Sequence, residues 1–402
     1  MGVLMKIYCF LIYFIVFSLL SGCNKENKLS GNPIPCERDS DCIDSDPCSI
    51  DYCNLEKKRC YHRLGCIKEV CSHSYYTCAI TYSGKLKCWG SNNMGALGNG
   101  DWRSSEIPVD VIGLNGPVKQ VSCGLEMACC IINGGVKFWE DGSSSHNVPE
   151  DVEGLTSGIT YVSCNEGICA ITESGGLKCP AHYPTYHYKD FGLTSNVVSI
   201  TLFPLHICAL MNSGELKCWG NNDYGQLGIG EAEYFTTHIP QTVTSLGNDV
   251  KGICKGGYYH TCAILKSGGL KCWGANYWGQ LGDGTTTNRF TPVDVYGITS
   301  EVEKVSCGVD FSCALLADGK VKCWGRNNYG QLGNGTLEQS LIPVDVIGID
   351  KKVVDLASGA SHSIVVLESG EVMYWGSGHP IYLDTDFESG PVTIPSYVLS
   401  SK

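Results

Sequence analysis

The chain has 402 residues and a formal net charge of −12, with 49 glycines, 25 cysteines and only 17% charged residues. The excess of negative charge argues against a nucleic-acid-binding surface. So many cysteines are typical of an oxidising compartment, and so many glycines of short strands joined by tight turns.

Residues 1–22 predict a bacterial lipoprotein signal. Lys6 precedes an apolar stretch, residues 7–20, that is too short to read as a membrane span. Small residues then lead into Cys23, which would carry the lipid after cleavage. The alternative is an ordinary secretory signal in which Cys23 occurs by chance. No Asp follows Cys23, so by analogy with enterobacterial sorting we expect a lipid-anchored envelope protein, in the outer membrane or at the cell surface.

Residues 23–35 are polar and contain Pro and Gly, which predicts a flexible, lipid-anchored linker. Residues 36–66 form a cysteine-rich module that is too short to bury a core and must therefore be held by disulfides. Six cysteines allow 15 connectivities, and the spacing does not choose among them. The module is rich in Asp, but it lacks the Gly and terminal Glu of an EF-hand loop, so we prefer solvated acidic turns to calcium, and disulfides to zinc.

Most of the remaining chain, residues 67–399, repeats one pattern about every fifty residues, a period typical of solenoids and propellers. Residues 313–335 (CALLADGKVKCWGRNNYGQLGNG) are its clearest copy. Five copies carry a Trp-Gly after the second strand-like run, and copy two has Trp139-Glu140 there. Copy three, residues 169–179, has Pro180-Ala181 at that place. Seven copies result.

Each copy contains a β-hairpin with a Gly-containing turn, flanked by one strand on each side. The turn centred on Ser83 places Cys78 directly opposite Cys88, within disulfide reach. The same spacing predicts five hairpin disulfides, Cys78–Cys88, Cys169–Cys179, Cys208–Cys218, Cys262–Cys272 and Cys313–Cys323. In copy seven, Ile364 and Tyr374 replace both cysteines together.

Seven further cysteines have no predicted partner, and bonds between neighbouring repeats are one possibility for them. They are Cys71, Cys123, Cys129, Cys130, Cys164, Cys254 and Cys307. Cys129 faces Phe138, so copy two has no hairpin pair. Without Cys9 and Cys23 the count is 23, an odd number, so at least one thiol should be free.

The motif GxNxxGQLGxG, with HTCA upstream and PV downstream, resembles the regulator-of-chromosome-condensation (RCC1) repeat family. The resemblance covers about four fifths of the chain; it is strong in copies one, four, five and six and weak in copies two, three and seven. It implies an all-β, seven-bladed β-propeller. We expect the strand near residues 391–398 to pair into the first blade and close the ring.

Several repeated residues are better explained by structure than by chemistry. His206, His260 and His362 recur on different blades, where packing is more probable than metal binding. Asp110, Asp294 and Asp345 recur in the outer strand. A ring of lysines could attract anions, but a solvated outer strand is the simpler interpretation; it comprises Lys87, Lys137, Lys178, Lys217, Lys271 and Lys322.

Loop aromatics are the candidate partner-binding residues. Tyr224, Trp278 and Tyr329 stand before GQLG in three consecutive repeats, and Trp102 follows the corresponding loop of the first. Such clusters often anchor binding, although each ring could instead cap its own blade.

We expect a monomeric, non-enzymatic scaffold for an unknown protein partner or ligand, with no cofactor, no metal, no nucleic acid, and membrane contact only through the lipid. Guanine-nucleotide exchange, which the resemblance suggests, conflicts with the signal sequence. A polysaccharide-acting enzyme would need unrepeated carboxylates or a Tyr/His pair at the channel mouth; its residues would lie in copies two and three, among His146, Glu150, Asp151, His182, Tyr183, Tyr186 and His187.

Overall fold

The computed structural model describes residues 36–43, 48–55, 58–125, 127–140, 147–180, 191–230, 235–377 and 390–399. The chain divides into two compact units, one of Met1–Ile43 with Asp51–Tyr61 and one of Asp44–Ile50 with His62–Lys402. The described helices are two short 3₁₀ turns, and neither has the length or apolarity to cross a bilayer.

The cysteine-rich region consists of η1 (Asp39–Asp41) and a two-stranded sheet of β1 (Ser49–Asn54) and β2 (Arg59–Leu64). Its connectivity, which the spacing left open, joins the first cysteine to the fourth, the second to the fifth and the third to the sixth: Cys36–Cys53, Cys42–Cys60 and Cys48–Cys66. Asp39 Oδ1 accepts a hydrogen bond from Cys53 N (2.9 Å), and Asp41 Oδ2 accepts one from Glu37 N (3.0 Å). These two carboxylates therefore hold turns of the module's own backbone.

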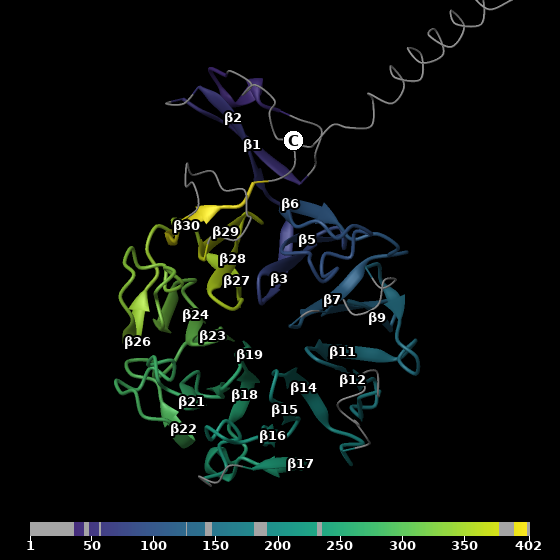
Figure 1. Ribbon diagram of the computed structural model, residues 1–402, viewed down its shortest axis with the longest axis vertical. Helices are drawn as coiled ribbons and strands as arrows, with labels where there is room; N and C mark the ends of the chain where they lie inside the picture. Colours follow the sequence, from purple (N-terminus) through teal and green to yellow (C-terminus); the bar gives the residue numbers. More distant parts are fainter. Residues whose placement is uncertain are drawn as a thin grey trace, which may run out of the picture. The chain divides into compact units, whose positions relative to one another are not determined.

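The second unit is a seven-bladed β-propeller, as the repeat predicts (Figure 1). The first three blades, from the innermost strand outward, are β3 (Ile67–His73), β4 (Tyr76–Thr81), β5 (Leu86–Gly90), β6 (Ser105–Asp110); β7 (Val118–Cys123), β8 (Met127–Ile132), β9 (Gly135–Glu140), β10 (Glu150–Asp151); and β11 (Ile159–Cys164), β12 (Ile168–Thr172), β13 (Leu177–Lys178).

The next two blades are β14 (Val197–Leu202), β15 (His206–Met211), β16 (Leu216–Asn221), β17 (Thr236–Thr242); and β18 (Val250–Ile253), β20 (His260–Leu265), β21 (Leu270–Gly274), β22 (Arg289–Asp294). The last two are β23 (Val302–Cys307), β24 (Phe311–Leu316), β25 (Val321–Gly325), β26 (Ser340–Asp345); and β27 (Val353–Ser358), β28 (His362–Leu367), β29 (Val372–Gly376), β30 (Val392–Tyr397). Two short elements complete the unit: η2 (Thr244–Leu246) follows β17, and β19 (Lys255–Gly256) pairs in parallel with β23.

Each hairpin has the register that its turn dictates. In blade 6 the turn glycine Gly319 has φ +85°, a left-handed conformation that only Gly adopts without strain. This turn sets Cys313 opposite Cys323, and the two form a disulfide with a Cα–Cα distance of 4.1 Å. The structure contains the four other hairpin disulfides with the same ten-residue spacing.

The motif loops join one blade to the next through tryptophan. Trp324 is fully buried, and its Nε1 donates to the Gln280 carbonyl of the preceding blade (2.9 Å). Gly282 lies beside this indole, and a Cβ at Gly282 would stand 2.7 Å from Trp324 Nε1. The motif therefore places a bare backbone against the neighbouring tryptophan. The same bond joins Trp273 to Gln226 and Trp375 to Gln331.

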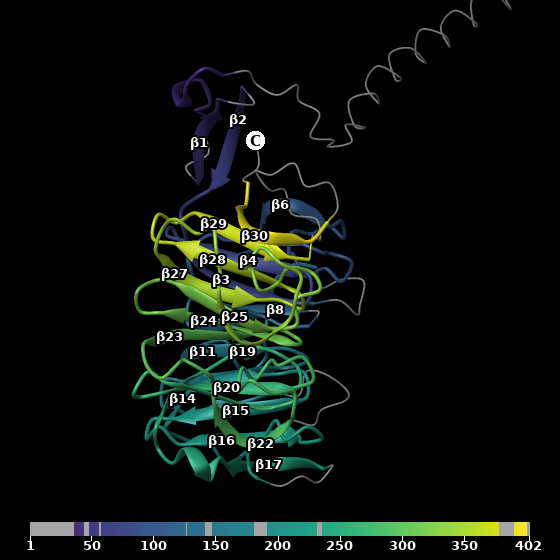
Figure 2. The same cartoon turned by 90° about the vertical axis from the view of Figure 1, so that its left-hand side faces the viewer.

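The predicted mode of ring closure was wrong. β30 pairs with β29 and completes blade 7, while blade 1 is built wholly from β3–β6. Side-chain and main-chain contacts close the ring instead: Asp355 Oδ2 accepts from Val70 N (2.9 Å), and His362 Nε2 lies 2.7 Å from Ser72 Oγ. In the edge-on views, β30 lies beside β29 in the same blade (Figure 2).

Blade 7 also uses Glu371 at this closing seam. Glu371 is 1% exposed and pairs with Lys351 and with Arg63, whose Nη1 lies 3.5 Å from Glu371 Oε1. The Arg63 guanidinium stacks on the Tyr397 ring, with its Cζ 3.5 Å from the ring centroid. An antiparallel bridge joins Arg63 to Leu399. The segment before blade 1 and the segment after β30 thus meet at the seam.

Candidate binding surface

The repeat loops present an aromatic ring on a rigid base. In blade 5, Asn276 Oδ1 accepts from Leu281 N (3.0 Å) and its Nδ2 donates to the carbonyls of Thr285 (3.0 Å) and Thr287 (3.1 Å). Gln280 Oε1 accepts from Trp278 N (2.9 Å). Asn and Gln therefore serve the loop itself. The indole of Trp278 remains partly exposed and takes no part in these bonds.

The predicted aromatics of blades 4, 5 and 6 form part of one continuous surface. The Tyr224 ring meets Tyr259 and Tyr277 edge to face, at centroid distances of 5.1 and 6.0 Å. Trp278, next to Tyr277, packs against Arg326 of the following blade, with the guanidinium 4.7 Å from the indole centroid. Tyr224 and Trp278 thus each contact residues of the next blade. We call the set the aromatic belt; it comprises Tyr224, Tyr258, Tyr259, Tyr277, Trp278, Arg326 and Tyr329.

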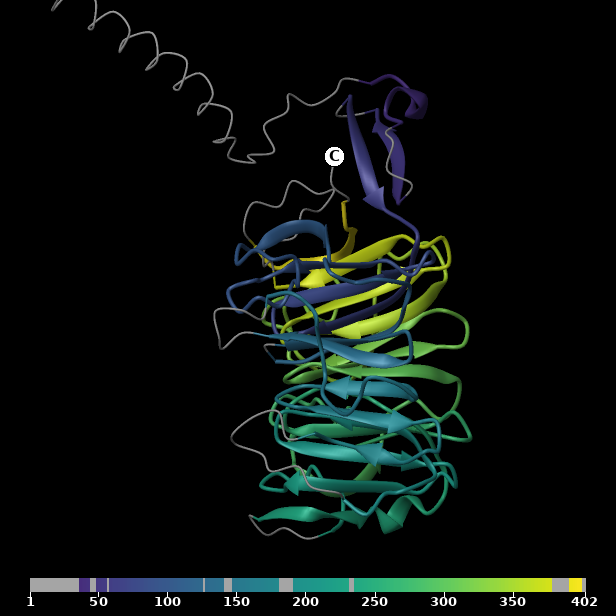
Figure 3. The same ribbon diagram turned by 90° about the vertical axis from the view of Figure 1, so that its right-hand side faces the viewer.

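The belt lies at one end of the strands. Its residues occupy the connections between first and second or between third and fourth strands of a blade, which share one end of an antiparallel sheet. Figure 3 shows the strands running across the propeller, so that its loops gather at two opposite faces. Tyr277 is 61% exposed and Tyr329 is 44% exposed, so the belt offers substantial ring surface to a partner.

Arg326 is the fixed charge of the belt. Its guanidinium lies between Trp278 and Tyr329 (6.0 Å to the Tyr329 centroid), and its Nη1 lies 3.2 Å from Asp310 Oδ2. Burial raises the pKa of Asp310, although the bond from Arg326 acts in the opposite direction. The belt therefore holds one well-oriented ion pair among uncharged rings.

Tyr258 packs on His73 of blade 1, with ring centroids 5.8 Å apart, and His73 lines the central cavity. Burial raises the pKa of Tyr258 to about 12 and lowers that of His73 to about 4, so both are neutral at physiological pH. Below them the inner strands of all seven blades enclose a cavity of about 30 Å³, which has room for a water molecule or two. The enzyme hypothesis requires a Tyr/His pair of this kind. His73, however, is only 4% exposed, so in this conformation it offers almost no surface to a substrate.

The repeated histidines lie at blade joints. His206 Nε2 lies 2.7 Å from Thr261 Oγ1, and His260 Nε2 lies 2.9 Å from Ser312 Oγ, in each case across to the next blade. Burial lowers the pKa of both imidazoles to about 3. With His362 bonded to Ser72 in the same manner, the three side chains serve packing between blades and do not converge on a ligand.

The repeated lysines pair within their own blades. Lys271 Nζ lies 2.7 Å from Asp294, and Lys322 Nζ lies 2.6 Å from Asp345. The pairs Lys87–Asp110 and Lys137–Asp151, both at 2.9 Å, repeat this arrangement. Lys217 instead bonds Glu215 and Thr242, and Lys178 is exposed in β13. Aspartates neutralise four of these lysines and Glu215 neutralises Lys217, so five of the six are not free to attract an anion.

Trp102 does not belong to the belt. It is 38% exposed in the loop between β5 and β6, and within the described part of the chain its ring makes no aromatic contact with a belt residue. Glu150 and Asp151 form β10, where Asp151 pairs with Lys137. The other enzyme candidates, His146, His182, Tyr183, Tyr186 and His187, lie outside the described residues, as does Cys23.

Sequence reasoning missed Tyr258, Tyr259, Tyr277 and Arg326. The Tyr258-Tyr259 pair stands where other repeats have Val309-Asp310 or Ser361, so a departure from the repeat was its signal. Nothing in the sequence marked Arg326, because its position between Trp278 and Tyr329 depends on how blade 6 packs against blade 5.

The fold and the loop motif agree with the comparisons to known proteins. The family model for the RCC1-like domain matches residues 19–398, and the chain belongs to this family. It is 27% identical over 308 residues to the ultraviolet-B receptor UVR8 of Arabidopsis thaliana, covering 75% of this chain and 63% of that protein. It is 34% identical over 197 residues to the mitochondrial RCC1 domain-containing protein RUG3 of the same plant, covering 47% and 43% of the two chains.

A third relative, the human E3 ubiquitin-protein ligase HERC2, is 37% identical over 186 residues, which are 45% of this chain and 4% of HERC2. The chain thus spans less than two thirds of each of these relatives. Among solved structures, yeast RCC1 (Prp20) bound to Kap60 superposes with a TM-score of 0.52 at 22% identity, covering 83% of this chain and 74% of that one. Human WBSCR16 gives a TM-score of 0.50 at 21% identity, covering 84% and 83%. These structures show the fold alone.

Proposed function

We propose that this propeller is a non-enzymatic interaction module that binds a protein partner through the aromatic belt. The observation that carries the proposal is the run of exposed and half-buried Tyr and Trp rings around Arg326. Tyr, Trp and Arg are the residues that dominate binding energy at protein interfaces. Their rings are held from below by the motif loops, so little side-chain entropy is lost on binding.

The belt fits a folded partner better than a small substrate. The axial cavity is too small for one, and the belt is a row of rings spread over blades 4 to 6. Relatives with this domain include a photoreceptor and ubiquitin ligases, so the family does not fix the partner.

We further propose that the protein is displayed on the cell envelope by a lipid on Cys23. The apolar stretch at residues 7–20 and the small residues before Cys23 support this, and the ten disulfides suit an oxidising compartment. Cys23→Ala should abolish palmitate labelling and release the protein from membranes. Continued membrane association of Cys23→Ala would overturn the anchor.

The belt can be tested by quantitative capture from envelope extracts with purified acyl-free protein. Tyr277→Ala combined with Trp278→Ala should weaken capture of the specific partner at least about tenfold, because each hot-spot ring contributes on the order of 2 kcal/mol. Trp102→Ala, an exposed aromatic outside the belt, is the matched control and should leave capture unchanged. Equal losses in both variants, or no loss in the belt variant at unchanged melting temperature, would overturn the proposal.

A further inference from the structure

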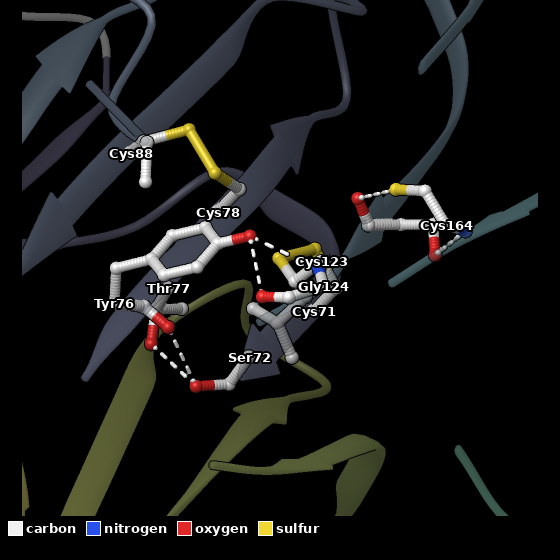
Figure 4. The surroundings of a disulfide bond; sticks show 12 residues. Cys71, Ser72, Tyr76, Thr77, Cys78, Cys88, Cys123, Gly124 and Cys164 are labelled. Carbon is white, nitrogen blue, oxygen red and sulfur yellow. Dashed lines mark hydrogen bonds between the residues drawn. A yellow bond between two sulfur atoms is a disulfide. The ribbon is translucent and has the colours of Figure 1, made fainter. Parts of the chain in front are cut away.

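Two disulfides join neighbouring blades through equivalent positions of their innermost strands. Cys71 of β3 bonds Cys123 of β7, and Cys254, just after β18, bonds Cys307 of β23. In each pair the fifth residue, counted from the start of one inner strand, meets the sixth residue of the next inner strand, with Cα–Cα distances of 5.6 and 5.8 Å. Figure 4 shows the Cys71–Cys123 bond beside the hairpin disulfide Cys78–Cys88.

The joint between blades 2 and 3 has only half of this bridge. Ser122 occupies the fifth position of β7, and Cys164 the sixth position of β11. Cys164 N donates to Ser122 Oγ (3.2 Å), and Cys164 Sγ donates to the Ser122 carbonyl (3.2 Å) (Figure 4). Cys164 therefore stands where an inter-blade sulfur belongs, opposite a serine.

A second unpaired thiol lies in the same joint. Cys129 of β8 is directly opposite Ser122, and it holds the hairpin position that Cys78 holds in blade 1. Its usual partner is replaced by Phe138. Cys129 and Cys164 are both fully or almost fully buried and belong to one core cluster.

The equivalent sulfurs of blades 5 and 6 show how close these positions come. There the Sγ atoms of Cys254, Cys262 and Cys307 all lie within 4.8 Å of one another. Cys262 and Cys307 occupy the positions of Cys129 and Cys164. Sulfurs this close are near bonding distance, and a disulfide between them further requires Cα atoms no more than about 7 Å apart.

We propose that Cys129 and Cys164 form an eleventh disulfide that staples blade 2 to blade 3. Each of these two cysteines has a residue other than Cys at its usual partner position, so each is available to bond with the other. Two thiols lose two protons and two electrons as one S–S bond forms, and the disulfide of a thiol–disulfide exchange partner is reduced to two thiols. Of the 23 cysteines after Cys23, only Cys130 then stays reduced; it belongs to the core cluster shared with blade 1.

The staple falls where the joint lacks the usual tryptophan. Blade 3 has Pro180 in place of the Trp whose indole would donate to the preceding blade. Its described sheet has three strands, the last of them only Leu177–Lys178. The proposed bond, from β8 of blade 2 to β11 of blade 3, holds this joint without that hydrogen bond.

Peptide mapping tests the proposal on the full-length chain, expressed with export and purified without reductant. Thiols are alkylated after acid quenching and denaturation, and free thiols are counted within residues 36–402. The wild type should show one free thiol, at Cys130, and a peptide linked through Cys129 and Cys164. Cys129→Ala should raise the count to two, and the matched variant Cys130→Ala should lower it to zero.

Reduced thiols predict the opposite pattern: three in the wild type and two in each variant. That pattern, or alkylated Cys164 in wild-type protein, would overturn the proposal. Should a variant fail to fold, the wild-type map alone decides, because incubation with oxidised glutathione must convert any remaining Cys129 and Cys164 thiols to the linked peptide. If this treatment yields only glutathione adducts, the pair is not a disulfide site.

Discussion

Neighbouring blades are held together in two different ways, one in blades 4 to 6 and another at the joints around blades 2, 3 and 7. In the regular blades, a motif carbonyl receives the next blade's indole, as in the Trp324–Gln280 bond. Blades 3 and 7 lack the GQLG loop, and among the described residues the Nε1 atoms of the following tryptophans, Trp219 and Trp89, have no acceptor. The repeat motif is thus a device for joining blades, and its loss is accompanied by other contacts, such as those of Glu371 at the seam.

Breaking the seam should have the largest effect. Glu371→Ala leaves Lys351 and Arg63 without their buried partner and should destabilise the propeller by about 3–5 kcal/mol, as expected when one member of a buried ion pair is removed. Denaturant unfolding measures this loss. A loss below about 1 kcal/mol would show that the seam does not depend on this pair.

The same carboxylate makes the seam sensitive to acid. Burial raises the pKa of Glu371, but hydrogen bonds from Lys351 and Ser369 and the charges of Lys351 and Arg63 outweigh it, so its pKa lies below the usual 4.5. A depressed carboxylate pKa contributes stability above pH 4.5 that is lost as the pH falls through the folded value. The wild-type melting temperature should therefore fall more steeply below pH 4.5 than that of Glu371→Gln.

Replacing a tryptophan with phenylalanine should have an intermediate effect on stability, and the effect should differ between the regular blades and the closing joint. Trp324→Phe removes an indole bonded to Gln280, whereas Trp89→Phe removes one whose Nε1 has no described acceptor. Both lose similar ring volume, so Trp324→Phe should cost about 1 kcal/mol more than Trp89→Phe. Equal losses in chemical denaturation would contradict the assigned role of the motif carbonyl.

Substitutions in the outer strands should have the smallest effect on stability, and the effect should be similar in regular and irregular blades. Lys322–Asp345 in blade 6 and Lys137–Asp151 in blade 2 are equivalent pairs with exposed carboxylates. Lys322→Ala and Lys137→Ala should each cost about 0.5 kcal/mol or less, and less still in high salt. A large, salt-insensitive loss for either variant would assign that lysine a structural role beyond the pair.

The repeat was enough to predict the number of blades and the register of the hairpins, because both follow from local turn geometry. Ring closure was not predictable in this way: β30 has Ile394-Pro395 where β26 has Ile342-Pro343, but residues 378–389 separate β30 from β29 in the sequence and made it look like an isolated strand. The belt was only partly predictable, since Tyr224, Trp278 and Tyr329 share a motif position whereas Arg326 and Tyr258 stand at other positions of the repeat.

Apart from the short β19, which pairs with β23 of the next blade, the described strands of each blade come from one stretch of sequence, because β30 stays with β29. A nascent chain can therefore complete each sheet in turn, without waiting for its other end. New termini placed between two blades would leave the antiparallel strand pairs within each blade on one continuous segment, and among the described sheets only the β19–β23 pair connects the stretches of two blades.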